Sequence, residues 1–365
     1  MGLQLARGFI APMLVGILVS GCGPSVPAAA PRPPKPPSPT NESASLPQRE
    51  PTLCALAGDL PPLQAAHFDR LSAQVSRNNL QASVHVLANP ALGGRGAGTP
   101  SNRRVANWIA GRFASYGLSS PPEADHCLPF ERDQIRDQNV VAHLVRSGDP
   151  NAPVVLVGAH YDAQGEKDAD VFPGADDNAS GVAALLEIAR LSAMRKSGPD
   201  MVFVAFGAEE NGLLGAKAYV EAPSVPLSRI MLMINLDMVG RPMLDGSPMR
   251  FFIPRADETI GYVIGNRDKP KTDELLHRAA AREDRPLIGI PEIVLTRLGF
   301  ASDSVPFSPH VPTIFLSTGD HADYHRPTDT PEKLDFEQLA RAARLTLAIV
   351  EEMQAPAVAR EITPN

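Results

Sequence analysis

Three polar clusters between Pro153 and Gly215 constrain this chain more than any other feature of its sequence. The sequence there contains VVLVGAHYD, GADDNASG and AFGAEENGLLG in succession. In each cluster, acidic or imidazole side chains directly follow an apolar run or a glycine-bearing turn. Two later stretches have the same character, MLMINLDMVGR at 231–241 and TIFLSTGDHADYHRPTDT at 313–330. The fold of this chain is therefore expected to bring several polar strand ends together.

The pattern around these clusters predicts alternating strands and helices. We expect strands at 139–145, 154–158, 201–206, 230–236 and 313–316. Helical spacing of apolar residues predicts helices at 63–75, 80–87, 103–116, 181–195, 213–220, 272–282 and 336–353. Continuous apolar strands separated by helices are typical of a sheet covered on both faces. The strand at 139–145 and its neighbour along the chain are close enough for a hairpin, so we expect a three-layer α/β/α fold with a mixed, mostly parallel central sheet.

The N-terminal residues predict export and a lipid anchor. After Arg7, the run FIAPMLVGILV is shorter than the roughly 20 apolar residues that span a bilayer, and it is typical of a signal-peptide core. The following Val19-Ser20-Gly21-Cys22 resembles a bacterial lipoprotein box, whose cysteine is lipidated; an ordinary signal peptide with an incidental cysteine is the alternative. Gly23 is not the aspartate that often retains lipoproteins at the inner membrane. We therefore expect an anchor at the cell envelope, on the periplasmic face of the outer membrane.

The composition of the remaining chain indicates a tether followed by a folded domain, and its net charge argues against binding to nucleic acid. The stretch GPSVPAAAPRPPKPPSPTNESASLPQREP has almost nothing to bury, so residues 22–51 are expected to be a Pro-rich tether after a signal peptide at 1–21. A proline-rich ligand for a partner domain is the alternative reading of this stretch. Residues 52–357 are expected to form a single domain, with a short tail at 358–365. A formal net charge of −7 argues against a nucleic-acid partner, and we expect a monomer.

Two cysteines remain after the predicted anchor, Cys54 and Cys127. In an oxidising envelope compartment, an isolated pair is expected to form a disulfide. This bond would tie the N-terminal arm of the domain to the segment before the first central strand.

The polar groups at the expected strand ends have the composition of a metal site. In open α/β sheets, ligands bind beyond the carboxyl ends of the strands. The groups expected there are imidazoles and carboxylates, namely His160, Asp177, Glu209, Glu210, Asp237 and His325. This ligand set suits catalytic zinc, with cobalt, manganese or iron possible by ligand type. Each motif alone has a plainer explanation: a hydrogen-bonded His-x-Asp pair, an Asx turn that caps a helix, or a solvated pair of glutamates.

The order of these motifs resembles the secreted dizinc aminopeptidases of metallopeptidase clan MH, over roughly residues 87–350. The resemblance implies a zinc-dependent exopeptidase fold and two zinc ions bound by five ligands. One ion would be held by His160, Asp237 and a bridging Asp177, and the other by Asp177, Glu210 and His325. Glu209 matches the general base of the family, which accepts a proton from a water activated by the metals.

The resemblance also implies a role for Tyr324 and a substrate class, and the position of Asp162, two residues after His160, indicates a supporting role. Tyr324 matches a position where some relatives carry a tyrosine that stabilises the oxyanion, although a packed aromatic residue is an equal alternative. Asp162 could accept the second imidazole N–H of His160. The substrates implied are peptides with a free N-terminus. A single-zinc glutaminyl cyclase of the same clan, a carboxypeptidase of related fold, and an inactive lipid-anchored binding protein are the alternatives.

The sequence departs from the family pattern at two positions. Asp176 stands where relatives often have asparagine, so an exchange of the bridging role between Asp176 and Asp177 is conceivable. Ser304 stands where many relatives have histidine, which puts a substrate role there in doubt. The stretch 241–298 is expected to hold a strand, a helix and loops that form a wall of the substrate pocket, with 302–310 contributing to the same wall.

Overall fold

The computed structural model describes residues 74–122, 124–265, 268–290 and 301–353. Contacts divide the chain into Met1–Arg49 and Glu50–Asn365, and all the described residues belong to the second unit. The predicted signal peptide, the tether, Cys22, Cys54 and the tail lie outside the described residues. None of the helices in the described ranges is long and apolar enough to cross a bilayer.

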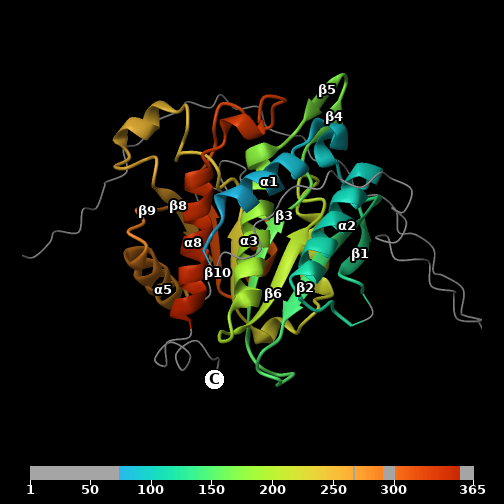
Figure 1. The fold of residues 1–365 in the computed structure, drawn as a ribbon, viewed down its shortest axis with the longest axis vertical. Coiled ribbons are helices and arrows are strands. Elements are labelled where there is room, and N and C mark those ends of the chain that lie inside the picture. Colours follow the sequence, from blue (N-terminus) through green and yellow to red (C-terminus); the bar gives the residue numbers. More distant parts are fainter. Residues whose placement is uncertain (1–73, 123, 266–267, 291–300, 354–365) are drawn as a thin grey trace, which may run out of the picture. The chain divides into compact units, whose positions relative to one another are not determined.

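An eight-stranded mixed sheet forms the centre of this unit (Figure 1). Its strands in chain order are β1 (Cys127–Arg132), β2 (Ile135–Leu144), β3 (Val154–His160), β6 (Asp200–Phe206), β7 (Ile230–Leu236), β8 (Ile260–Ile264), β9 (Leu287–Gly289) and β10 (Thr313–Ser317). The spatial order is β1-β2-β6-β3-β7-β10-β8-β9. The central pairings β6 with β3, β3 with β7 and β7 with β10 are parallel. The mixed, mostly parallel sheet predicted from the sequence is confirmed.

The strand at 139–145 was expected to form a hairpin with the next strand along the chain, and this prediction is wrong. β2 pairs antiparallel with β1 on one side and with β6 on the other, so that β6 lies between β2 and β3. Both β3 and β6 are buried along their whole length. A fully buried strand needs partners on both edges, and the pairing of β3 with β6 and β7 supplies them.

Helices cover both faces of the sheet. On the face turned to the viewer in Figure 1 lie α1 (Arg77–Leu87), α2 (Pro100–Ser115), α3 (Gly181–Met194), α5 (Lys269–Arg282) and α8 (Phe336–Glu352). The opposite face is covered by α4 (Leu214–Glu221) and the short α7 (Ser304–Phe307), which contact β2 and β7 respectively. Tyr219 and Phe307 from these two helices pack with Phe206 in a second, smaller core. The three-layer arrangement is therefore present.

Two helices begin where a capping side chain in the local sequence accepts hydrogen bonds from the first amides of the helix. Thr99 caps α2 by accepting a hydrogen bond from the Asn102 amide, so this helix begins at Pro100, three residues before the expected start. Asp335 caps α8 in the same way, through the amides of Glu337 and Gln338. Of the helix expected at 63–75, only residues 74 and 75 are described, and they are not helical.

The remaining elements are short. They are the 3₁₀ helices η2 (Pro90–Arg95), η4 (Leu227–Arg229), η5 (Pro248–Phe252) and η6 (Pro331–Lys333), the π-helical turn η3 (Ala175–Ser180), and the hairpin β4 (Gly165–Lys167) with β5 (Asp170–Phe172). Cys127 is buried and disulfide-bonded. Because Cys54 is not described, its pairing with Cys127 stays a prediction.

Candidate metal centre

The predicted ligands meet at one edge of the sheet because the strands that precede them are neighbours. His160 is the last residue of β3, and Asp237 directly follows β7, which is parallel to β3. Glu210 lies on the turn after β6, on the other side of β3. Asp177 comes from η3, at the start of α3, and His325 from the loop after β10. The carboxyl ends of parallel strands thus deliver these groups to a common site.

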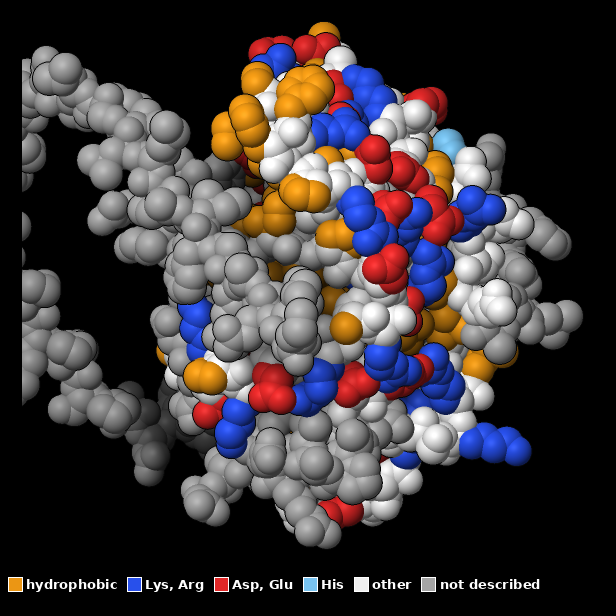
Figure 2. All heavy atoms as spheres, turned by 90° about the vertical axis from the view of Figure 1, so that its left-hand side faces the viewer, with side chains coloured by type: hydrophobic (Ala, Val, Ile, Leu, Met, Phe, Trp, Pro, Cys, Tyr) orange, Lys and Arg blue, Asp and Glu red, His pale blue; other side chains and the backbone are white. Residues whose placement is uncertain are grey.

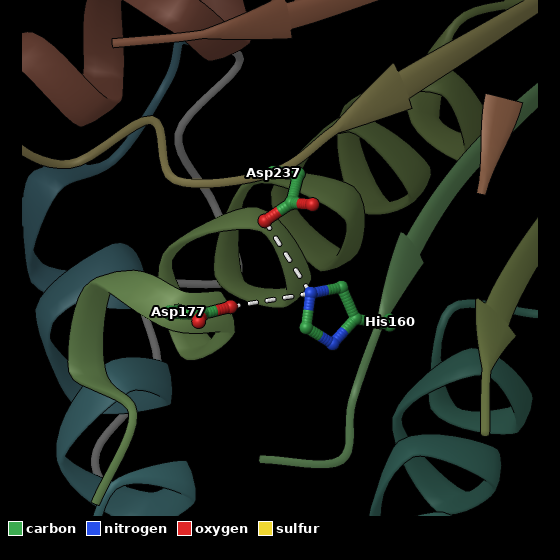
Figure 3. A group of neighbouring side chains, drawn as sticks. All are labelled: His160, Asp177 and Asp237. Carbon is green, nitrogen blue, oxygen red and sulfur yellow. Dashed lines mark hydrogen bonds and ion pairs between the residues drawn. The ribbon is translucent and has the colours of Figure 1, made fainter. Parts of the chain in front are cut away.

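The first group consists of His160, Asp177 and Asp237, all of them buried. Figure 3 shows both carboxylates directed at the His160 ring. His160 Nε2 lies 3.3 Å from Asp177 Oδ1 and 3.3 Å from Asp237 Oδ1. Although burial acts in the opposite direction, the surrounding carboxylates Glu209 and Asp237 raise the pKa of His160 well above its usual value. The same carboxylates would stabilise a divalent cation.

The second group consists of Asp177, Glu210 and His325. His325 Nε2 lies 3.1 Å from Asp177 Oδ2 and 3.1 Å from Glu210 Oε2. Against the opposing effect of burial, these carboxylates raise the pKa of His325 to about 10. Asp177 therefore directs one carboxylate oxygen at each histidine, as the predicted bridging role requires, whereas Asp176 belongs to neither group.

The spacing of these atoms fits zinc ligation. Two ligands at about 2.0–2.2 Å from a tetrahedral zinc lie about 3.4 Å from each other. The measured separations of 3.1–3.3 Å agree with this value for both groups. Glu210 Oε1 is also buried without a hydrogen-bond partner, which is costly unless a ligand uses it. The donor set, with imidazole and carboxylate and no thiolate, is that of a catalytic rather than a structural zinc site.

Glu209 and Glu210 are held by the fully buried Asp162. The Glu209 amide donates to Asp162 Oδ1 at 3.0 Å, and the Glu210 amide donates to Asp162 Oδ2 at 3.2 Å. Asp162 Oδ1 also lies 3.7 Å from His160 Nδ1, which is beyond hydrogen-bond distance. In this structure Asp162 therefore orients the turn that carries the two glutamates more directly than it orients the imidazole.

Tyr324 lies beside the second group. Its ring stacks on that of His325, with the centroids 3.8 Å apart. Burial and the carboxylates of Asp177 and Asp237 raise the pKa of Tyr324 above its usual value, so the phenol keeps its proton and is a hydrogen-bond donor. This is the form that an oxyanion stabiliser requires.

A cavity of about 410 Å³ opens next to Asp237 and Tyr324. Its other lining residues are mostly apolar: Met238, Met243, Leu244, Ile253, Ile288, Ile290, Ala301, Phe315, Ser317, Gly319 and Asp320. Met243, Leu244, Ile253, Ile288 and Ile290 lie in the stretch 241–298 that was expected to form a wall of the substrate pocket. No residue of 302–310, which was expected to contribute to the same wall, lines this cavity. Next to Ile253, Phe251 and Phe252 of η5 are 92% and 79% exposed. Figure 2 shows hydrophobic side chains gathered near the top of the face that carries this segment.

Several residues near the ligands were missed by the sequence reasoning. Ser302 donates to Asp237 Oδ2 at 2.6 Å and accepts from Asn235 at 2.6 Å, which fixes the Asp237 carboxylate. Asp303 is fully buried, and neither of its carboxylate oxygens has a hydrogen-bond partner. Gln164 donates to Glu210. The alternation of β7, which turns Asn235 to the same side as Asp237, was the signal available for Asn235.

Arg95 was also missed, and it supports the segment before Asp177. Its guanidinium is fully buried and donates to four carbonyl oxygens, those of Leu87, Tyr161, Pro173 and Gly174. Burial lowers its pKa to about 10, while nearby carboxylates act in the opposite direction. Arg95 thus places one buried positive charge beside an acidic site, and no local pattern in the sequence indicates it.

Together, the sheet and the two His/carboxylate groups at its carboxyl-end edge define a metal-dependent exopeptidase fold. The model of Peptidase family M28 matches residues 139–350, more than half of the chain, and the chain belongs to this family. It is 33% identical over 236 residues to the aminopeptidase YwaD of Bacillus subtilis, covering 62% of this chain and 46% of YwaD. A second similar protein is an aminopeptidase of Pseudomonas aeruginosa, 42% identical over 138 residues, covering 36% of this chain and 24% of the relative. The chain spans about half the length, or less, of these curated relatives.

Solved structures show the same fold. A zinc aminopeptidase from Bacillus subtilis superposes with a TM-score of 0.59 at 20% identity, covering 79% of this chain and 98% of that one. A glutaminyl cyclase from Porphyromonas gingivalis superposes with a TM-score of 0.60 at 20% identity, covering 77% and 100%. Because both chemistries occur on this fold, the likeness concerns the fold, and the reaction has to be argued from the site.

Proposed function

We propose that this chain is a metal-dependent aminopeptidase that hydrolyses the N-terminal residue from peptides. The observation that carries the proposal is the position of Asp177, which directs one carboxylate oxygen at each of two complete ligand groups. A carboxylate shared in this way is the arrangement of two-metal hydrolases. The family membership and the aminopeptidase relatives support the same reaction.

The residues of the site have distinct tasks in this reaction. Zinc ions held by the two groups would supply Lewis acidity toward water and the scissile carbonyl, and cobalt or manganese could replace them. The Glu209 carboxylate accepts a proton from the attacking water as the new C–O bond forms. It returns that proton to the leaving amine as the C–N bond breaks. Tyr324 donates a hydrogen bond to the oxyanion that develops on the carbonyl.

The surroundings of Glu209 suit a group that takes up and releases a proton. Burial raises the pKa of Glu209 well above its usual value, and the nearby Asp303 and Asp237 act in the same direction, while His160 opposes them. Glu209 is therefore a buried carboxyl whose proton affinity depends on its neighbouring charges, as is typical of groups that transfer protons in active sites.

The cavity beside Asp237 indicates which peptides are preferred. An N-terminal side chain entering it would contact Met243, Ile288 and Phe315, among other apolar residues. Burying an apolar side chain there stabilises the complex by about 25 cal/mol per Å² of apolar surface removed from water. We therefore propose peptides with apolar N-terminal residues as the substrates.

A glutaminyl cyclase is the competing enzyme, because such a cyclase shares the fold. The resemblance implies a single zinc for that reaction, whereas this chain retains ligands for two. A catalytically inactive binding protein would not need Glu209 or the complete ligand groups. The two complete groups favour hydrolysis over both alternatives.

Hydrolysis of a panel of aminoacyl p-nitroanilides tests the proposal. The chain from Gly23, without the predicted signal peptide and lipidated cysteine, is assayed as purified, after chelation, and after zinc is restored. Zinc-restorable release from apolar aminoacyl substrates is the expected result. Two bound zinc ions without release, or cyclisation of an N-terminal glutamine peptide, would reject the aminopeptidase in favour of binding or cyclase activity.

We also propose that the enzyme is a lipoprotein of the bacterial cell envelope, anchored through Cys22. The support comes from the sequence alone: an apolar run followed by Val19-Ser20-Gly21-Cys22 and a Pro-rich stretch to residue 51. A lipidated cysteine would confine the domain to peptides that reach the membrane surface. Metabolic labelling with a radioactive fatty acid is expected to mark the wild type and not Cys22→Ser; label in both would reject the anchor.

A further inference from the structure

Three buried polar residues lie behind the two ligand groups and have no part in the proposed chemistry. Asp176, Asp329 and His321 are 0%, 2% and 7% exposed. None of them belongs to either group of possible metal ligands. Burying such groups is costly unless they are hydrogen-bonded, so their partners indicate what they do.

Asp329 binds the backbone of the segment that carries Asp177. Asp329 Oδ2 accepts hydrogen bonds from the amides of Asp176 at 3.0 Å and Asp177 at 3.1 Å, and Oδ1 accepts from the Asp176 amide at 3.1 Å. The Asp329 carbonyl also accepts from the Ala175 amide at 3.2 Å. Asp329 belongs to the loop that contains His325. It therefore joins the loop of His325 to the segment of Asp177, the residue that belongs to both ligand groups.

Asp176 and His321 connect a third loop to the same point. Asp176 Oδ1 accepts from the Gly240 amide at 2.7 Å, and Gly240 lies three residues after Asp237. A Cβ at Gly240 would stand 2.9 Å from that oxygen, so glycine permits the close approach. On the other side, Asp176 Oδ2 lies 3.4 Å from His321 Nε2. The Asp323 amide donates to His321 Nδ1 at 3.2 Å, which leaves the His321 proton on Nε2, facing Asp176.

The three loops that are joined carry Asp177, Asp237 and His325. Each loop begins beyond the end of the sheet, where strand pairing no longer fixes its position. The carboxylates of Asp177, Glu210 and Asp237 also repel one another in the absence of a cation. A site that binds metal tightly needs its ligands held at their final spacing beforehand, because ordering them on binding would reduce the affinity.

We propose that Asp176, His321 and Asp329 form a brace that sets the positions of Asp177, Asp237 and His325 before metal binds, with Asp329 as the principal positioning residue. The inference rests on the proposed two-metal function. It adds that metal affinity in this chain depends on hydrogen bonds between loops, and on the ion-pair contact of Asp176 with His321, none of which involves the metal or the substrate.

The test is the zinc affinity of Asp329→Asn, measured by competition with a chromophoric chelator on metal-free protein. Asparagine keeps one acceptor oxygen and places an NH2 donor where the other oxygen was. With the NH2 at the Oδ2 position the Asp177 N–H loses its acceptor, and with the NH2 at the Oδ1 position this donor faces the Asp176 N–H. We expect zinc to bind about 10- to 100-fold more weakly, as is typical when a residue that orients metal ligands is changed. The visible spectrum of the cobalt-substituted variant is expected to change as well, because the ligand geometry relaxes.

Glu187→Gln is the matched control. Glu187 is also a buried carboxylate, 2% exposed, which accepts from the Ser76 amide at 2.7 Å and from Asn79 Nδ2 at 3.0 Å, but it lies on α3 and belongs to neither ligand group. The Glu187→Gln substitution is expected to lower the free energy of unfolding without changing zinc affinity or the cobalt spectrum. Wild-type zinc affinity in Asp329→Asn, with a loss of stability like that of the control, would overturn the brace.

A milder variant keeps the inference testable if Asp329→Asn does not fold. His321→Ala removes the contact to Asp176 Oδ2 and the acceptor of the Asp323 amide, but leaves the hydrogen bonds of Asp329 in place. Zinc affinity is expected to fall about 3- to 10-fold, less than for Asp329→Asn. Unchanged affinity in folded His321→Ala would count against the brace. Failure of the proposed function is distinguishable, because wild-type protein that binds two zinc ions but releases no amino acid would reject the aminopeptidase and leave the brace intact.

Discussion

Replacing Glu209 with glutamine is the most direct test of the proposed chemistry. Glutamine has the same shape but cannot accept a proton at this position. The Glu209 amide would keep its hydrogen bond to Asp162 Oδ1, since that bond involves only the backbone. Glu209 belongs to neither ligand group, so the five metal ligands stay in place. The substitution therefore removes the base and leaves the metal site.

The expected loss follows from the role of the carboxylate. A positioned general base contributes about 10²- to 10⁴-fold to a rate, which corresponds to about 3–5 kcal/mol of activation free energy. We therefore expect kcat to fall about 10³-fold, with KM changed by less than about threefold, because binding of the substrate does not need the proton transfer.

The assay combines turnover of an apolar aminoacyl p-nitroanilide with elemental analysis of bound zinc. Glu221→Gln serves as the control, since Glu221 is an exposed carboxylate that pairs with Arg132 away from the ligand groups. A Glu209→Gln protein that retains two zinc ions and more than about a third of wild-type kcat would refute the assignment of Glu209 as the base. Loss of zinc together with activity would instead assign Glu209 to metal binding.

Three further predictions concern the bridging ligand, the pocket and pH. Asp177→Asn is expected to lose zinc from both groups and Asp237→Asn from one, as measured by zinc content after dialysis; equal stoichiometry in the two variants would contradict a bridge. Phe315→Ala enlarges the cavity, so kcat/KM for leucyl substrates is expected to fall about 10-fold, and less for larger aromatic residues; an equal fall for all substrates would contradict the assignment of the pocket. Burial, together with Arg229 and His126, lowers the pKa of His143 from 6.5 to about 4. Between these values the unfolded chain binds a proton that the folded chain does not, so the stability of metal-free protein is expected to fall by at most about 3 kcal/mol as pH drops from 6.5 to 4. Urea unfolding at several pH values checks this, and His143→Gln should show a shallower dependence; an identical slope in both proteins would argue against it.

The sequence determined those parts of the molecule that depend on neighbouring residues. The strand at 230–236 has the predicted bounds, and α3 ends one residue before the expected end, because continuous apolar runs and glycine-bearing turns act over a few residues. The candidate ligands His160, Glu210 and Asp237 could be predicted for the same reason, since each lies at the end of a recognisable strand or within four residues after it. Once parallel strands are expected, their carboxyl ends must share an edge.

Only the tertiary structure decided which strands and loops are neighbours. The insertion of β6 between β2 and β3 pairs residues that lie 46 positions apart in β3 and β6 and 57–65 positions apart in β2 and β6, and no local pattern encodes that pairing. No local pattern encodes three other long-range hydrogen bonds either. Ser302 donates to the Asp237 carboxylate, and Arg95 donates to the Gly174 carbonyl before Asp177. Asp329 accepts from the amides of Asp176 and Asp177. A side chain such as Asp329 has the same local sequence whether it faces water or a distant backbone. Its role depends on long-range packing, which brings separate loops to the same end of the sheet and leaves their amides without partners from strand pairing.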